Sequence, residues 1–169
     1  MGRSDLLRKI SFPKWIIVVS STITALINFL INLCVIIVFA LLNGVTPSFT
    51  WLLAPLVILE LYLLSLGIAF FLGSINVKYR DISSIWEVLM QALFYAVPII
   101  YPITMVSASS AVAAKVLLLN PIAKVIQDAR YLLITNQSIT VWNFIDNIFL
   151  RFLPVLITLF ILIIGSIYF

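Results

Sequence analysis

Glu60 is the residue of this sequence whose position most directly predicts chemistry. It is the only charged residue in the apolar segment 51–77. A carboxylate within such a segment is costly, and in membrane proteins it marks either a substrate path or a bond to a neighbouring helix. Two uses of Glu60 therefore stay open: contact with the hydroxyl groups of a passing substrate, or a structural bond, in protonated form, to another helix.

Two further groups of charged residues have informative spacing. Lys124 and Asp128 are four residues apart, so they share one face of a helix and can form an ion pair. Lys78, Arg80 and Asp81 stand in the short sequence NVKYRDIS, residues 76–83, between two apolar segments. In the simplest interpretation, the two cations of this short loop only fix the topology of the chain in a membrane.

The sequence excludes several classes of site. It has no histidine, one cysteine and six Asp or Glu residues, so it contains no cluster with metal-ligand spacing and no Ser/His/Asp or Cys/His set. It also has no GxxxxGK[ST] motif for a nucleotide phosphate. We therefore expect neither an autonomous enzyme nor a cofactor on this chain.

The composition defines the fold class. Apolar residues make up 64% of the chain, charged residues 9%, and the mean hydropathy is +1.25, values typical of an integral membrane protein. We predict a single all-α membrane domain over residues 1–169, with four transmembrane helices at about 15–43, 51–77, 82–106 and 150–169. Pro98 and Pro102 should interrupt the third span near its far end.

The segment 108–135 is apolar but cannot form one further span. Asn120 and Pro121 divide it into two pieces, each too short to cross a bilayer. Asn120 is a good helix cap, and proline is favoured at the first position of a helix. The sequence therefore predicts a broken re-entrant or interfacial helical hairpin between spans three and four.

The distribution of cations predicts the orientation. Cations precede the first span and the third, whereas the loop between the first two spans has no charge. Because positively charged flanks stay in the cytoplasm, the N-terminus and residues 76–83 should be cytoplasmic. Four crossings then place the C-terminus in the cytoplasm and the hairpin outside.

Five short sequences along the chain resemble one protein family. They are LLRKISFPKW, NVKYRDIS, VPIIYPI, LNPIAKVIQDARYLL and the final GSIYF. In this order and at about this spacing, they resemble the permease subunit of type-2 ATP-binding-cassette (ABC) exporters. The most similar branch exports O-antigen, capsular polysaccharide or teichoic acid. The resemblance covers essentially the whole chain and implies that it is the C-terminal part of a permease, without the N-terminal helices and the polar tail of that family.

The resemblance implies partners and a substrate. It implies a homodimeric permease in the bacterial cytoplasmic membrane, served by a separate ATP-binding subunit that holds ATP and Mg²⁺. The cargo would be a polysaccharide linked to a polyprenyl pyrophosphate lipid. Two alternatives stay open: a permease of the same architecture for a drug or a simple lipid, and a membrane-embedded enzyme acting on polyprenyl lipids.

The resemblance also assigns residues to ATPase coupling. It makes 4–14 a coupling helix that docks on the ATPase, and 76–83 a second coupling loop. The residues concerned are Leu7, Arg8, Lys9, Ile10, Phe12, Lys78, Arg80 and Asp81. In the alternative interpretation, the first of these segments is a basic amphipathic flank that lies on anionic lipid.

Two more residue sets follow from the resemblance. A translocation path would be lined by Glu60, Tyr62, Phe94, Tyr95 and Tyr101, although aromatic side chains also serve as packing or interfacial anchors. The outer hairpin contributes Asn120, Pro121, Lys124, Asp128 and Arg130. If exposed, Lys124 and Arg130 would bind a pyrophosphate near the exit; ion pairing with Asp128 is the alternative.

Overall fold

A computed structural model describes residues 15–79, 81–135 and 137–169 of the protein. It is 83% helical and has no strands among the described residues, which confirms the all-α fold class. The elements run in the order α2 (Trp15–Leu42), the 3₁₀ helix η1 (Phe49–Leu53), α3 (Ala54–Lys78), α4 (Ile82–Ala96), α5 (Ile103–Ser109), α6 (Ala111–Leu119), α7 (Pro121–Leu133), α8 (Val141–Phe144) and α9 (Ile148–Tyr168).

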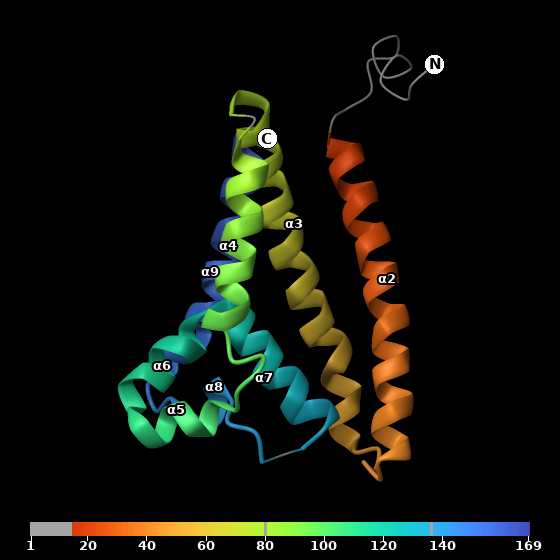
Figure 1. Ribbon diagram of the computed structural model, residues 1–169, viewed down its shortest axis with the longest axis vertical. Helices are drawn as coiled ribbons and strands as arrows, with labels where there is room; N and C mark the ends of the chain where they lie inside the picture. Colours follow the sequence, from red (N-terminus) through yellow and green to blue (C-terminus); the bar gives the residue numbers. More distant parts are fainter. Residues whose placement is uncertain (1–14, 80, 136) are drawn as a thin grey trace.

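Three segments are long and apolar enough to cross a membrane: α2, η1 with α3, and α9. They correspond to the predicted first, second and fourth spans. The start of α2, the end of α3, the start of α4 and the C-terminus lie at one end of the molecule, while α5, α6 and α8 lie at the other (Figure 1). We refer to these as the terminal end and the hairpin end.

The predicted third span, 82–106, is not one helix. Only the 15 residues of α4 are continuous, so the number of four transmembrane helices is not confirmed. Val97, which precedes Pro98, is extended with φ −93° and ψ 143°, because a proline disfavours helical conformation in the residue before it. The chain becomes helical again only after Pro102, where α5 begins. The prolines thus end the helix rather than kink it.

The hairpin at the turn between α6 and α7 has the local structure that its sequence predicts. The side chain of Asn120 accepts a hydrogen bond from the Ile122 backbone N–H at 3.0 Å, and Pro121 is the first residue of α7. The cap satisfies an N–H group that has no partner within the helix, and proline needs none. A small core of Ile103, Ala114, Leu118, Val141 and Ile145 joins α5, α6 and α8.

The centre of the molecule is the pair of helices α3 and α9, which pack on each other more extensively than any other two described elements. They approach most closely at Gly67 and Gly165. A Cβ atom on Gly67 would lie 2.7 Å from the Cα of Leu162, and one on Gly165 would overlap the carbonyl oxygen of Gly67. Glycine is required here because only it allows two backbones to come this close.

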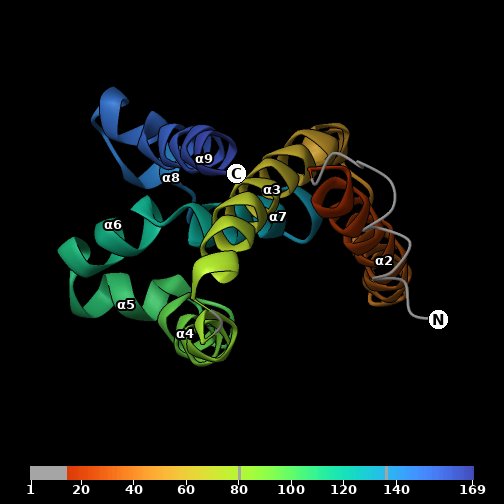
Figure 2. The same ribbon diagram turned by 90° about the horizontal axis from the view of Figure 1, so that it is seen from above.

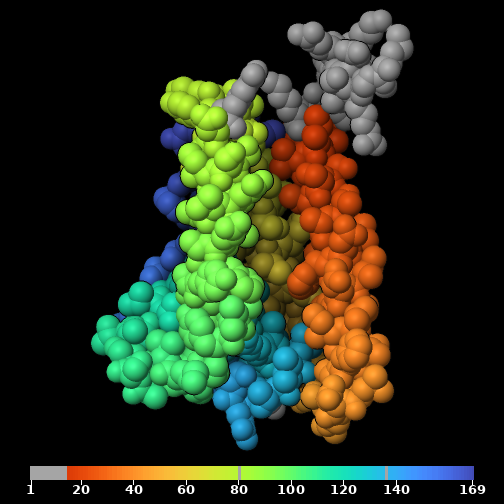
Figure 3. Space-filling view, viewed as in Figure 1, coloured from red at the N-terminus to blue at the C-terminus, as the bar shows by residue number. Residues whose placement is uncertain are grey.

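Helix α7 packs beside both members of this pair toward the hairpin end. Seen from above, α2, α4 and α9 lie around α3 and α7 (Figure 2). Helices α2 and α4 contain no buried residue. Figure 3 shows them as two separate columns, with α3 visible at the back of the hollow between them.

Candidate functional site

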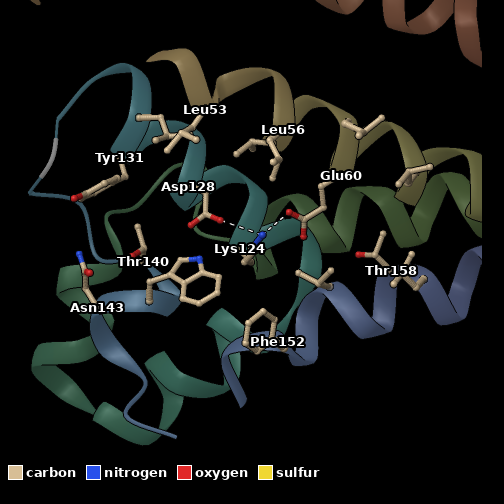
Figure 4. A pocket seen from close by; sticks show the side chains of 17 residues that line it. Leu53, Leu56, Glu60, Lys124, Asp128, Tyr131, Thr140, Asn143, Phe152 and Thr158 are labelled. Carbon is tan, nitrogen blue, oxygen red and sulfur yellow. Dashed lines mark hydrogen bonds and ion pairs between the residues drawn. The ribbon is translucent and has the colours of Figure 1, made fainter. Parts of the chain in front are cut away.

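The candidate site is a cavity of about 560 Å³ between α3, α7, α8 and α9. This volume lies within the range of about 300–1,000 Å³ that is usual for small-molecule sites. Figure 4 shows the side chains around it. The lining residues are Leu53, Leu56, Val57, Leu59, Glu60, Leu63, Lys124, Asp128, Tyr131, Leu132, Thr140, Trp142, Asn143, Phe152, Val155, Thr158 and Leu159.

Three charged side chains of this cavity form one group, which we call the ion cluster: Glu60, Lys124 and Asp128. The Lys124 Nζ atom contacts the Glu60 Oε2 atom and lies 3.1 Å from the Asp128 Oδ2 atom. Lys124 is 4% exposed, and the two carboxylates are each 8% exposed. A cation shared by two carboxylates in an apolar site offsets much of the cost of burying all three charges.

The ion cluster joins two elements that are distant in the sequence. Glu60 comes from α3, and its partner Lys124 lies 64 residues further along, in α7. Asp128 follows on the next turn of α7, so the two α7 residues face α3 together (Figure 4). An apolar contact among Val57, Val125 and Leu132 supports the same interface.

Helix α7 is held by two more polar contacts. The Arg130 guanidinium donates a 2.7 Å hydrogen bond to the carbonyl oxygen of Ile99, in the turn that follows α4. The Thr50 hydroxyl of η1 donates to the carbonyl oxygen of Leu132 at 3.1 Å. Together with the ion cluster, these contacts tie α7 to three separate parts of the chain.

Two buried polar atoms of this region have no hydrogen-bond partner among the described residues: Oε1 of Glu60 and Nε2 of Gln127. Gln127 is 2% exposed and lies on α7 beside a second, smaller hollow of about 210 Å³ near Arg130. An unpaired buried polar atom costs about 1–3 kcal/mol, so each of these atoms is expected to bond to a water, an ion or a ligand group.

The structure decides between the alternatives for the hairpin charges. Lys124 is buried and paired with Asp128, as the spacing of four residues predicted, and also with Glu60. The expectation of an exposed Lys124 that binds pyrophosphate is therefore wrong. Two carboxylates lie beside this ammonium group, and Lys124 is only 4% exposed. Arg130 is only half-buried, and its guanidinium already donates one hydrogen bond to a backbone carbonyl, that of Ile99.

The five residues predicted to line a translocation path do not come together. Only Glu60 lines the cavity. Phe94 and Tyr95 form an edge-on ring pair, 5.5 Å between centroids, on the exposed surface of α4. Tyr62 is half-buried on α3, and the Tyr101 hydroxyl donates to the Ala96 carbonyl oxygen at 3.3 Å.

The predicted coupling residues are described only in part. Lys78 ends α3, is exposed, and lies 5.4 Å from the centre of the Tyr79 ring. Asp81 precedes α4, is exposed, and makes no side-chain cap there. Both lie at the terminal end (Figure 1). Leu7, Arg8, Lys9, Ile10, Phe12 and Arg80 lie outside the described residues.

For several cavity residues, no feature of the sequence predicts a place in the site. Thr140, Trp142 and Asn143 lie in and beside the four-residue helix α8, where no periodicity or motif singles them out. Their place at the cavity follows from tertiary structure: the apolar core under α8 fixes this short segment against α5 and α6.

The helices and their buried charges thus define a multi-pass, all-α membrane protein. Comparison with known proteins then shows which family it resembles. The chain is 34% identical over 119 residues to the O-antigen export system permease protein RfbA of Myxococcus xanthus, which covers 70% of this chain and 45% of that protein. No protein-family model matches the chain.

Two proteins of the same description from Klebsiella pneumoniae give weaker matches. Each is 26% identical, one over 107 residues (63% of this chain, 41% of the relative) and one over 133 residues (78% and 50%). Over 63–78% of its length the chain is thus similar to permeases of O-antigen export systems, the family that its motifs resemble. It spans half or slightly less than half of the length of these relatives.

Proposed function

We propose that the protein is a permease subunit of an ABC exporter. It moves a polysaccharide linked to polyprenyl pyrophosphate, such as O-antigen, capsule or teichoic acid, across the bacterial cytoplasmic membrane. The observation that carries this proposal is the similarity to O-antigen export permeases over 63–78% of the chain. Those relatives are transport proteins, so the chain's role is transport rather than catalysis.

The proposal includes partners. A permease of this kind needs a separate ATP-binding subunit, which holds ATP and Mg²⁺, and a second permease copy. On this proposal the terminal end faces the cytoplasm, where Lys78 and Asp81 at the junction of α3 and α4 contact the ATPase. Their exposure supports this role, because a coupling loop must present side chains to its partner.

The orientation gives the hairpin end its role. With the terminal end in the cytoplasm, α5, α6 and the end of α7 lie at the outer side of the membrane (Figure 1). The ion cluster then fixes α7 against the spanning helix α3, near the side where a polymer leaves. Helix α3 spans the membrane and connects the two ends of the molecule. On this proposal, α3 transmits a movement of the coupling loop to the hairpin.

Two experiments test this function. Deleting the gene should abolish the surface polysaccharide of the host, seen on a silver-stained gel, and lipid-linked polymer should accumulate inside the cell. Affinity isolation of the tagged protein from its native membranes should recover an ABC ATPase. A normal surface polysaccharide together with lost drug resistance would instead favour a drug permease.

The coupling residues are tested by Arg80→Ala and Asp81→Ala in the complete transporter. On the proposal, each lowers ATP hydrolysis that depends on substrate while the subunits remain assembled. Unchanged substrate-dependent hydrolysis in both variants would leave Lys78 and its neighbours as topology anchors only. The enzyme alternative makes a different prediction, since polyprenyl lipids would then be chemically altered by the purified protein without ATP.

A further inference from the structure

The cavity beside the ion cluster has two contrasting halves. One half is apolar and lies between the two closely packed helices, with Leu56, Leu59 and Leu63 on α3 and Phe152, Val155 and Leu159 on α9. The other half has Tyr131, Thr140, Trp142 and Asn143, whose hydroxyl, indole and amide groups can donate hydrogen bonds. Figure 4 shows the ion cluster near the middle of the cavity, with Asn143 and Thr140 toward one end and Thr158 toward the other.

The charges of the ion cluster do not balance. It contains two carboxylates and one ammonium group, and Oε1 of Glu60 has no partner among the described residues. Excess negative charge in an apolar site is costly unless a proton or a second cation neutralises it. Glu60, Lys124 and Asp128 all line the cavity, so a cationic group of a ligand in the cavity lies next to the ion cluster, and a rotation of the Glu60 side chain would expose its buried Oε1 atom to that group.

The apolar half is accessible from the lipid phase. Leu56, Leu59, Phe152 and Leu159 line the cavity and are still 40–66% exposed in the described structure. Glu60 is six residues past the start of α3, roughly 9 Å along the helix axis at 1.5 Å per residue, and η1 adds the five residues Phe49–Leu53 to the spanning segment before it. A molecule with its chain in the bilayer and its polar group near the end of α3 therefore fits this position.

We propose that the cavity binds one membrane phospholipid with a primary ammonium group, of the phosphatidylethanolamine type. The ammonium group donates hydrogen bonds to Glu60 and Asp128, and an acyl chain lies between α3 and α9. The phosphate accepts hydrogen bonds from Thr140, Asn143 and the indole of Trp142. This lipid completes the interface between α3 and α7, and its binding requires only that the protein lies in a membrane, whatever the exported substrate is.

Photo-cross-linking in nanodiscs tests the proposal on the complete protein. Nanodiscs of phosphatidylglycerol contain a small share of phosphatidylethanolamine with a photoactivatable acyl chain; parallel discs contain phosphatidylglycerol with the same chain. Peptide mass spectrometry locates the labelled residues. We expect the α3 and α9 residues of the cavity to be labelled about tenfold more by the ethanolamine probe, the scale of one hydrogen bond to a charged group.

Variants separate the head group from the chain. E60Q keeps the shape of the side chain and removes its charge, so the preference for ethanolamine over glycerol should fall to about onefold. Leu159→Trp fills the apolar half without touching the ion cluster and should reduce labelling several-fold. Leu156→Trp is the matched control, because Leu156 is exposed on the same helix but does not line the cavity.

Three results would overturn the proposal. Equal labelling by both probes would mean that a proton, rather than a lipid ammonium group, neutralises the ion cluster. Equal labelling in Leu159→Trp and Leu156→Trp would show ordinary annular lipid. Absence of label from the α3 and α9 cavity residues would mean that another part of the protein fills this space. Because the assay measures lipid contact and not export, none of these results bears on the proposed transport function.

Discussion

Helices α2 and α7 contrast in both composition and environment. Helix α2 has no charged residue in its 28 positions, and none of its residues is buried in the described structure. Helix α7 carries Lys124, Asp128 and Arg130, and six of its 13 residues are buried. The most apolar helix thus has no buried residue in the described structure, while a helix with three charges is packed against several other elements.

This arrangement follows from the solvent of a membrane protein. Lipid tails solvate apolar side chains as well as a protein core does, so an apolar helix gains little from burial in protein. A charged side chain finds no partner in lipid and must find one inside the bundle. Polar contacts and close backbone packing should therefore dominate the stability of α3, α7 and α9, and the surface of α2 should matter little.

The largest expected effect is the loss of the shared cation. Lys124→Met leaves Glu60 and Asp128 close together without a counter-charge and should cost about 3–5 kcal/mol. A large drop in the apparent melting temperature in detergent micelles would show it. Lys115→Met on the neighbouring helix α6 is the control, because Lys115 is outside the ion cluster and should change the temperature little. Equal effects of the two variants would contradict the stabilising role of the cluster.

The next effect concerns the close approach of α3 and α9. Gly165→Ala places a Cβ atom against the carbonyl oxygen of Gly67, and backbone cannot move aside as a side chain can. We expect a loss of about 1–3 kcal/mol, the usual cost of overpacking. In Gly73→Ala the new atom would meet side chains rather than backbone, the Phe169 ring at 3.2 Å and the Val18 Cγ2 atom at 3.9 Å, so this variant should be tolerated. The same melting experiment compares them, and a stable Gly165→Ala protein would refute the close packing.

A smaller effect comes from a single neutral hydrogen bond. Thr50→Val removes the donor to the Leu132 carbonyl oxygen and should cost about 1 kcal/mol, since one tie between η1 and α7 is lost. Thr24→Val on α2 removes only a bond to the Ser20 carbonyl oxygen within the same helix, on an exposed face. Equilibrium unfolding of the two variants should show a deficit in Thr50→Val alone; comparable deficits would show that tertiary and local bonds count equally here.

The sequence predicted the local features of this fold well. Asn120 with Pro121 marked the turn into α7, because these residues act on the backbone beside them, whereas Pro98 and Pro102, expected to interrupt a span over 82–106 near its far end, instead end α4. The spacing of four residues also placed Lys124 and Asp128 together, since a helix alone fixes that geometry. Such predictions need no knowledge of how the helices pack.

The candidate site was less predictable, because its key contacts are tertiary. Helical periodicity shows which face of α3 carries Glu60 but not which helix covers it, and its partner lies 64 residues away. The aromatic residues Phe94 and Tyr95 were predicted to line a translocation path together with Glu60, yet they lie on the exposed surface of α4 while Glu60 lines the cavity. A set of residues chosen by type alone therefore did not define a cavity.

The smallest effect should come from the face of α2, and it provides the strictest test of the contrast between the helices. Phe39→Ala removes a large side chain that is 62% exposed. Lipid tails can fill the space, so we expect a change below about 0.5 kcal/mol. Leu64→Ala on α3 removes a smaller side chain that is only 2% exposed, yet it leaves a cavity and should cost about 2–5 kcal/mol.

Unfolding of both variants in bilayer nanodiscs measures the difference between their losses of unfolding free energy. If α2 faces lipid, the protein concentration should not affect this difference. A large loss in Phe39→Ala that disappears on dilution would mean instead that a second protein surface covers α2. The contrast would then separate two kinds of interface, one within the chain that encloses charges and one between chains that is wholly apolar. If the change in unfolding free energy of Phe39→Ala is small at every protein concentration, the face of α2 contacts lipid. Lipid tails are fluid and fill the space that the lost ring leaves, whereas a packed protein surface would retain a cavity.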